Sequence, residues 1–220
     1  MRWFKPQPQG YDDEAVADLV IRKTKAIDAA VRLEDILPAE FLLPTLMAIA
    51  CSGDRVLDFG GGAGLQYLAA SRAFPRRAFR WAIVEHPLML RRTKELEREN
   101  LKFFSSPESA LDWLGHVDLL HSNGVLQYLD EPEAMLLRLL AIHPTWVSWS
   151  RLLLGPEKIV GTQVAPLSAH GPGPLPPGVV DREITHKTTV MIEAAFWAAH
   201  SGYRTVWRSA DSMVLERSVV

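Results

Sequence analysis

The sequence predicts a doubly wound α/β fold in which mostly parallel strands alternate with helices. Three observations lead to this prediction. A glycine-rich turn at residues 56–64 joins a buried strand to a helix, strand-like and helix-like segments alternate as far as residue 153, and the chain ends on a helix followed by a β-hairpin. Parallel strands need crossover connections, so this alternation favours a parallel sheet with helices on its faces.

Each element is predicted from its hydrophobic period and its flanking breakers. The expected strands are residues 55–59, 79–85, 101–104, 117–122 and 145–149, the last continuing toward 153. The expected helices are residues 12–37 with a break near Val31, 39–50 with a kink at Pro44, 63–73, 88–99, one starting at 106–108, 131–142 and 188–200. A hairpin is expected from 202–207 and 212–216, whereas the Pro- and Gly-rich residues 155–178 are expected to lack regular structure.

Composition narrows the possible classes of protein. The 220 residues suit one α/β domain with a small addition, and 48% hydrophobic residues are enough for a sizeable core. A net charge of −2 gives no electrostatic case for nucleic acid or an anionic membrane. Cys51 is the only cysteine and the seven histidines are scattered, so no disulfide and no metal site is expected. The apolar runs are short and the first residues carry no leader pattern, which makes a cytoplasmic location the default expectation.

The most informative motif is Asp58 followed by glycines at positions 60, 62 and 64. A strand that turns sharply into a helix needs residues without a Cβ, both for unusual dihedral angles and for close approach of a ligand. The N–H groups at the start of the following helix suit a carboxylate or another anion. The carboxylate of Asp58 can accept hydrogen bonds from a cationic amine.

The spacing of these glycines separates the candidate cofactors. A dinucleotide fingerprint counted from Gly60 requires a third glycine where the chain has Leu65, and no Gly-Lys-Ser/Thr follows to make a phosphate loop. The remaining pattern, Asp-x-Gly-x-Gly-x-Gly, resembles the first motif of class I S-adenosylmethionine (SAM) methyltransferases. A glycine-rich turn that binds nothing is the alternative.

Polar residues at the ends of the other strands extend this candidate site, because ligands of open α/β sheets lie at the carboxyl ends of the strands. Glu85 follows the second strand, about 20 residues past Gly64, where an acidic group can accept both ribose hydroxyls of an adenosine. Ser105 and Ser106 follow the third strand and suit either an adenine edge or a helix cap. Ser122, Asn123 and Gly124 follow the fourth and would line the floor of the pocket.

Taken together, the elements Phe59–Gly62, Glu85, Ser122–Leu129 and Gly10–Tyr11 resemble a bacterial family of class I SAM methyltransferases whose members are often associated with polysaccharide-biosynthesis loci. The resemblance implies a Rossmann-like, seven-stranded, mostly parallel sheet with an antiparallel last strand and an N-terminal helical cap. The implied domains are a cap at residues 1–50 and a SAM-binding α/β domain at residues 51–220, with an insertion at 155–182. The cofactor-binding residues it implies are Asp58, Phe59, Gly60, Gly61, Gly62, Gly64, Glu85, Ser105, Ser106, Ser122, Asn123 and Gly124.

The chain departs from this family on the side of the pocket that would hold the methyl acceptor. The family usually carries Asp-Arg-Thr-Pro-Phe after the fifth strand, where this chain has residues 150–154, Ser-Arg-Leu-Leu-Leu. Gln163–Pro166 matches a later family element, and Thr185–Lys187 stands near the place of a family Ser-Tyr-Pro. These differences leave the acceptor open.

The expected function is SAM-dependent methyl transfer to a small molecule such as a sugar or a biosynthetic intermediate. A base is needed only if the acceptor must lose a proton. His121 and His186 are candidates for it, and His170 is a third, although each can equally be a satisfied core histidine. A SAM-binding accessory protein without catalysis is the alternative, and a nicotinamide oxidoreductase is disfavoured by the glycine spacing. Neither nucleic acid nor a membrane is an expected partner, and the oligomeric state stays open.

Overall fold

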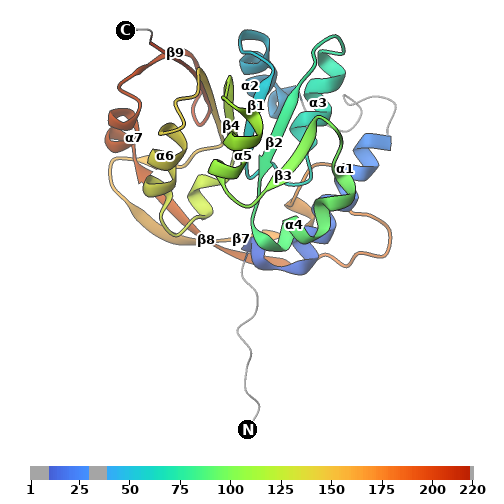
Figure 1. The fold of residues 1–220 in the computed structure, drawn as a ribbon. Coiled ribbons are helices and arrows are strands. Elements are labelled where there is room, and N and C mark those ends of the chain that lie inside the picture. Colours follow the sequence, from blue (N-terminus) through green and yellow to red (C-terminus); the bar gives the residue numbers. More distant parts are fainter. Residues whose placement is uncertain (1–9, 30–38, 219–220) are drawn as a thin grey trace.

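A seven-stranded sheet organises the fold of the computed structural model, which describes residues 10–29 and 39–218 (Figure 1). The strand order is β3-β2-β1-β4-β5-β10-β9, with β1 to β5 parallel and β10 antiparallel to β5. The strands are β1 (Arg55–Phe59), β2 (Arg80–Val84), β3 (Leu101–Phe104), β4 (Leu119–Asn123), β5 (Trp146–Ser150), β9 (Tyr203–Arg208) and β10 (Met213–Arg217). The predicted seven-stranded sheet with its antiparallel last strand is confirmed.

Helices cover both faces of this sheet. One face carries α5 (Pro107–Leu114), α6 (Pro132–Leu140) and α7 (Glu193–Ala199), and the other carries α2 (Ala39–Cys51) and α3 (Leu65–Ala73). The two faces use alternate residues of the same strands: Leu57 packs into the first core and Val56 into the second. Central strands that are buried on both faces explain why residues 55–59 read as a short apolar run rather than as an alternating one.

Residues 10–29 lie at the end of the sheet where β2 leads into α4 (Figure 1). A one-turn 3-10 helix, η1 (Gly10–Asp12), precedes α1 (Glu14–Ala29). Helix α1 packs through Ala17 and Ile21 against Ala63 of the glycine-rich turn and against α4 (Pro87–Thr93). Of the predicted helix at 12–37, the described part ends at Ala29, and the expected break near Val31 lies outside the described residues. The proposed domain boundary at residue 50 stays a prediction.

The segment after β5 forms a second, three-stranded sheet with the order β6-β8-β7. Its strands are β6 (Leu154–Gly155), β7 (Ile159–Pro166) and β8 (Glu183–Ile192), and β7 and β8 run across the end of the main sheet (Figure 1). The expectation of no regular structure at 155–178 is therefore wrong for residues 159–166. Strand β7 is stabilised by antiparallel pairing with β8, a distant partner that the local Pro and Gly content does not reveal.

Two predicted helices are also corrected. The segment 188–192 belongs to β8, and α7 starts only at Glu193. Thr188, Thr189 and Val190 are β-branched residues, which fit a pleated strand better than a helix, so strand pairing overrides the weak helical period. The helix expected at 88–99 ends at Thr93 and continues as a 3-10 turn, Lys94–Leu96. The remaining strands and the terminal hairpin agree with the prediction to within two residues.

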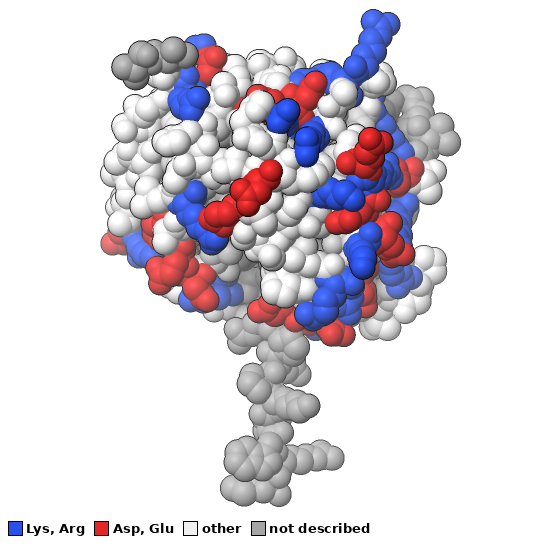
Figure 2. Space-filling view, viewed as in Figure 1, with Lys and Arg blue, Asp and Glu red and all other residues white. Residues whose placement is uncertain are grey.

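Acidic and basic side chains are interspersed on the face that Figure 2 shows. Many of them form exposed ion pairs, such as the one between Arg138 and Glu108. Within the described ranges, no helix is both long and apolar enough to span a bilayer.

Candidate functional site

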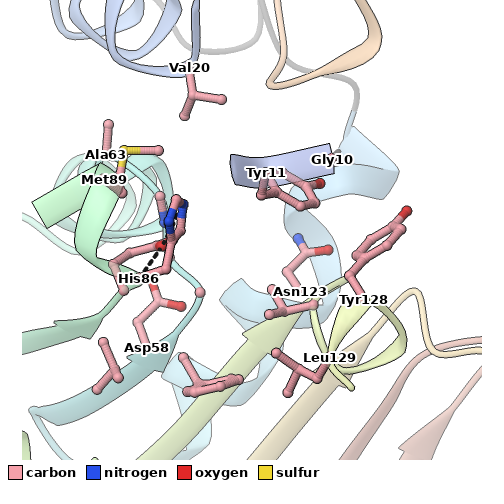
Figure 3. Close-up of a pocket in the computed structure, with 18 of the residues that line it drawn as sticks. Gly10, Tyr11, Val20, Asp58, Ala63, His86, Met89, Asn123, Tyr128 and Leu129 are labelled. Atoms are coloured by element: carbon pink, nitrogen blue, oxygen red, sulfur yellow. Dashed lines mark hydrogen bonds and ion pairs between the residues drawn. The ribbon is translucent and has the colours of Figure 1, made fainter. Parts of the chain in front are cut away.

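A cavity of about 580 Å³ opens at the carboxyl ends of β1, β2 and β4. The glycine-rich turn and Glu85 form one wall, and η1, Tyr128 and His186 of β8 form the opposite one. Figure 3 shows Tyr11 and Tyr128 side by side across the cavity from Met89. The volume falls within the range of small-molecule sites, about 300–1,000 Å³.

The glycine-rich turn gives this cavity its backbone wall. Gly62 has a φ of 59° and Gly64, at the N-terminus of α3, has a φ of 90°, both in the left-handed region that side chains strongly disfavour. A Cβ on Gly61 would stand 2.4 Å from an oxygen of Asp58. The turn therefore lies directly against the end of β1 and leads into the N-terminus of α3.

Glu85 joins β2 to this turn. Its carboxylate accepts hydrogen bonds from the backbone N–H groups of Gly62 at 2.8 Å and of His86 at 3.0 Å. Burial raises the pKa of Glu85 to about 7, against the opposing effect of these two donors. A buried carboxylate with this pKa gains from further donors, and two ribose hydroxyls would supply them.

Asp58 is the centre of a buried polar network. It is 1% exposed, and its two oxygens accept hydrogen bonds from Nδ1 of His121 at 2.9 Å and from Nε1 of Trp81 at 3.2 Å. Nε2 of His121 contacts the hydroxyl of Thr45 at 2.9 Å. Both ring nitrogens of His121 are thus occupied, and the ring is fully buried. This geometry supports the satisfied core histidine rather than the base.

The predicted serines divide between the cavity and the scaffold. Ser105 lines the cavity, but Ser106 caps α5 by accepting the N–H of Ser109 at 3.2 Å, so the alternative reading as a helix cap fits it. Asn123 and Gly124 line the cavity, whereas Ser122 is 2% exposed and lies behind them. The predicted cofactor-binding residues that line the cavity are Asp58, Phe59, Gly60, Gly61, Gly62, Glu85, Ser105, Asn123 and Gly124; Gly64, Ser106 and Ser122 do not, and the candidate bases His121 and His186 do.

Three aromatic rings form the wall opposite the glycine-rich turn. The ring centroids of Tyr11, Tyr128 and His186 lie 5.2–5.3 Å from one another. His170 stacks on His186 with a centroid distance of 4.8 Å, and the two Nε2 atoms are 2.6 Å apart. We call Tyr11, Tyr128, His170 and His186 the aromatic wall. It joins η1, η3 (Leu126–Tyr128), the end of η4 (Leu167–Ala169) and β8.

A buried lysine holds the segment behind this wall against α1. Nζ of Lys23 donates to the carbonyls of Ser168 at 2.7 Å and Gly171 at 2.9 Å, and the residue is 2% exposed. Burial lowers the pKa of Lys23. A charged group at this depth is retained because it satisfies two carbonyls that would otherwise lack donors.

Sequence reasoning assigned no site role to several residues that line the cavity. These are Tyr11, Val20, Thr24, His86, Met89, Arg151, Gly171 and Pro172. Tyr11 belonged to the family resemblance, which was the one available signal. Arg151 follows β5 with a φ of 54° and donates from Nε to Asn123 at 2.6 Å, an arrangement that the altered motif at 150–154 did not foretell.

Among the described residues no group of three or more His, Cys, Asp or Glu side chains is arranged to hold a metal ion.

Comparison with known proteins identifies the fold but no sequence family. No family model and no curated protein matches the chain. The solved structure of the CcbJ methyltransferase from Streptomyces caelestis matches with a TM-score of 0.54 and 15% identity, covering 94% of this chain and 100% of that one. Human N-acetylserotonin methyltransferase in complex with SAM gives 0.53 and 14%, covering 95% of this chain and 58% of that one.

A third solved structure, the sugar N-methyltransferase KedS8 from a Streptoalloteichus species, has a TM-score of 0.51 and 14% identity, covering 100% of this chain and 97% of that one. At such identities the likeness is one of fold. The chain has the Rossmann-like fold of class I SAM-dependent methyltransferases.

Proposed function

We propose that this protein binds SAM between the glycine-rich turn and Glu85 and transfers its methyl group to a small-molecule acceptor. One observation carries the proposal: the glycine-rich turn, Glu85 and the polar end of β4 line a single cavity of about 580 Å³, and the carboxylate of Glu85 is bonded to the turn. A turn that binds nothing would not need a buried acidic group aimed at its backbone.

The cofactor-binding residues follow from the chemistry of the wall. The N–H groups of Gly60, Gly62 and Gly64 donate to Val84, Glu85 and Gly61, so the carboxylate of the methionine part would bind the N–H groups at the start of α3, because a helix N-terminus favours anions. Glu85 would accept the ribose hydroxyls, and Ser105 would lie beside the adenine. Asp58 also lines the cavity; each of its oxygens accepts one hydrogen bond, from His121 and from Trp81, and its remaining lone pairs could accept from the methionine amine. Bound SAM supplies an electrophilic methyl group on a sulfonium.

The opposite side of the cavity supports a small acceptor. The aromatic wall offers ring faces and edges, which bind flat or cyclic molecules through apolar and polar contacts. The mixed charges of the face in Figure 2 lack the basic stripe that binds a polyanion. Membership of the polysaccharide-associated family and a sugar as acceptor stay proposals.

Calorimetric titration with SAM, and with NAD as the control ligand, tests the cofactor. We expect SAM to bind and NAD to give no heat of binding. Glu85→Ala should weaken SAM binding at least tenfold, about 1.4 kcal/mol, through loss of the acceptor for two hydroxyls. The matched variant Glu95→Ala changes an exposed glutamate paired with Lys25 and should leave the affinity unchanged. Equal effects of the two variants would contradict the proposed site.

Turnover is tested by release of S-adenosylhomocysteine with a panel of hydroxylated and aminated sugars and phenols. Release with at least one acceptor is the expected result. SAM binding without turnover on every acceptor would favour the accessory protein without catalysis.

A further inference from the structure

An accessible arginine at the end of β5 lines the cavity. Arg151 is an exposed residue, and its backbone has a φ of 54°, in the left-handed region that residues with a Cβ disfavour. Its backbone N–H donates to the hydroxyl of Ser212 at 3.2 Å, which helps to hold this conformation. Backbone in such sparsely populated regions is concentrated at sites that bind ligands.

The residues that end β4 orient the guanidinium group of Arg151. Its Nε donates to Oδ1 of Asn123 at 2.6 Å, and one terminal nitrogen donates to the backbone carbonyl of Asn123 at 3.2 Å. A Cβ on Gly124 would stand 2.7 Å from that terminal nitrogen, so the group lies against the bare backbone of Gly124. Both acceptors are neutral, so these two bonds orient the guanidinium without offsetting its positive charge.

The two bonds to Asn123 use one edge of the planar guanidinium, the edge that contains Nε. The edge between the two terminal nitrogens has two parallel N–H groups whose spacing matches the oxygens of a carboxylate or phosphate. The chemistry of Arg151 therefore suits a bidentate contact with such an anion.

The other arginine and lysine side chains that line the cavity, among the described residues, pair with carboxylates. Lys187 lies 2.7 Å from Asp130, and the guanidinium of Arg138 donates to both oxygens of Glu108, at 2.6 and 2.5 Å. Arg151 differs from them in that its hydrogen bonds to Asn123 go to neutral groups.

The acids that line the cavity on the cofactor side are separated from Arg151 by a strand. Asp58 lies on β1 and Glu85 follows β2, and β4 stands between these strands and β5 in the sheet. The side chain of Asp12 is 85% exposed, and its carboxylate lies 4.0 Å from Nδ1 of His86, on the same side.

The positive charge of Arg151 acts on the aromatic wall. Burial raises the pKa of the Tyr11 phenol to about 12, and the guanidinium of Arg151 opposes this rise. Tyr11 and Arg151 both line the cavity. Arg151 therefore belongs to the side of the cavity that the proposed function gives to the methyl acceptor.

We propose that the methyl acceptor carries a carboxylate or phosphate group and that the guanidinium of Arg151 binds this group. The inference rests on the proposed function and narrows its substrate class to anionic small molecules, with a flat or cyclic part against the aromatic wall. Arg151 determines specificity in this arrangement and takes no part in the methyl transfer itself.

Benzoate and phenyl phosphate serve as anionic probes, and benzamide is the neutral control of the same shape as benzoate. Each is titrated calorimetrically into the full chain without cofactor at pH 7. We expect at least one anion to bind about tenfold or more tightly than benzamide, because hydrogen bonds to a charged group are the stronger ones. The tighter of the two anions identifies the group. If neither anion binds more tightly than benzamide at millimolar concentrations, the proposal is overturned.

Two substitutions at residue 151 and one matched control assign the preference to this guanidinium. Arg151→Gln should remove the preference for the anion and leave the affinity for benzamide unchanged. Arg151→Lys keeps the charge without the planar fork and should retain part of the preference. Arg138→Gln removes a guanidinium of the same cavity that already binds Glu108, and the full preference should remain. A preference that survives Arg151→Gln, or that Arg138→Gln also removes, would contradict the assignment.

The carboxylate of the cofactor is the competing partner for this guanidinium. Calorimetry with SAM on the wild type and on Arg151→Gln separates the two, and we expect the same SAM affinity in both. A loss of SAM affinity in Arg151→Gln as large as its loss of anion affinity would assign the guanidinium to the cofactor and overturn the inference. A wild-type protein that binds the anion through Arg151 but binds no SAM would contradict the proposed function alone.

Discussion

The two walls of the cavity differ in how far apart their residues lie in the sequence and in the chemical groups that they contribute. The wall with the glycine-rich turn comes from residues at the ends of adjacent strands, and it includes the carboxyls of Asp58 and Glu85. The aromatic wall comes from residues far apart in the chain and carries neutral imidazoles and phenols. The proposed function places the cofactor against the first of these walls and the methyl acceptor against the second.

Removing the carboxylate of Asp58 tests whether its hydrogen bonds to His121 and Trp81 also stabilise the fold. Asp58→Ala leaves Nδ1 of His121 and Nε1 of Trp81 without an acceptor inside the core, so we expect the free energy of unfolding to fall by about 3 kcal/mol. Urea denaturation measures it. Asp58→Asn keeps one acceptor oxygen and should lose clearly less. A wild-type midpoint for Asp58→Ala would show that the network adds nothing to stability.

Blocking the turn tests whether its backbone contacts the cofactor. Gly62→Val forces a β-branched residue into a φ of 59° with its Cβ 3.3 Å from Val20, which costs about 2 kcal/mol of folding stability. Because Gly62 lines the cavity, the added side chain should separately weaken SAM binding, by roughly thirtyfold. Gly202→Val is the matched control, because nothing lies within 4 Å of a Cβ there. Calorimetry compares the two variants. Unchanged affinity in Gly62→Val would remove the steric argument.

Removing the ammonium group of Lys23 tests whether the segment behind the aromatic wall unfolds independently of the rest of the protein. Lys23→Met removes the donor to Ser168 and Gly171, and we expect a loss of about 1.5 kcal/mol that is confined to residues 167–182. Hydrogen exchange should accelerate there and stay unchanged in β1 and β2. Lys25→Met, on the same helix but in an exposed ion pair, is the control. Uniform acceleration would mean that the two walls unfold as one unit.

The smallest expected effect is the pH dependence of SAM binding. Because the pKa of Glu85 is raised to about 7 and ribose hydroxyls favour the ionised carboxylate, SAM binding should release a proton. Affinity should then rise about eightfold from pH 6 to 7.5, because the ionised fraction of the free carboxyl rises from about 0.1 to about 0.8. Calorimetry in buffers of different ionisation enthalpy counts the protons released. Glu85→Gln should abolish the release; if the release persists, another group is responsible.

The elements that the sequence predicted well have local signals. Residues 55–59 and 101–104 were predicted with the bounds observed, because a short apolar run between strand-breaking residues is enough to indicate a buried strand. The positions of Glu85, Asn123 and Gly124 followed from the rule that parallel strands end at one edge. The predictions for β7 and for residues 188–192 were wrong, because two strands separated by a Pro- and Gly-rich loop stabilise each other only when they meet.

By itself, the sequence determined the wall whose residues lie within a few positions of a strand end: the glycines at 60, 62 and 64, the acid at 85 and the sheet that presents them. Only the tertiary structure decided that Tyr11, Tyr128 and His186 meet across the cavity and that Asp58 is hydrogen-bonded to His121. Strand and turn signals act over a few residues along the chain. Hydrogen bonds between distant side chains exist only once packing has brought the groups within about 3 Å.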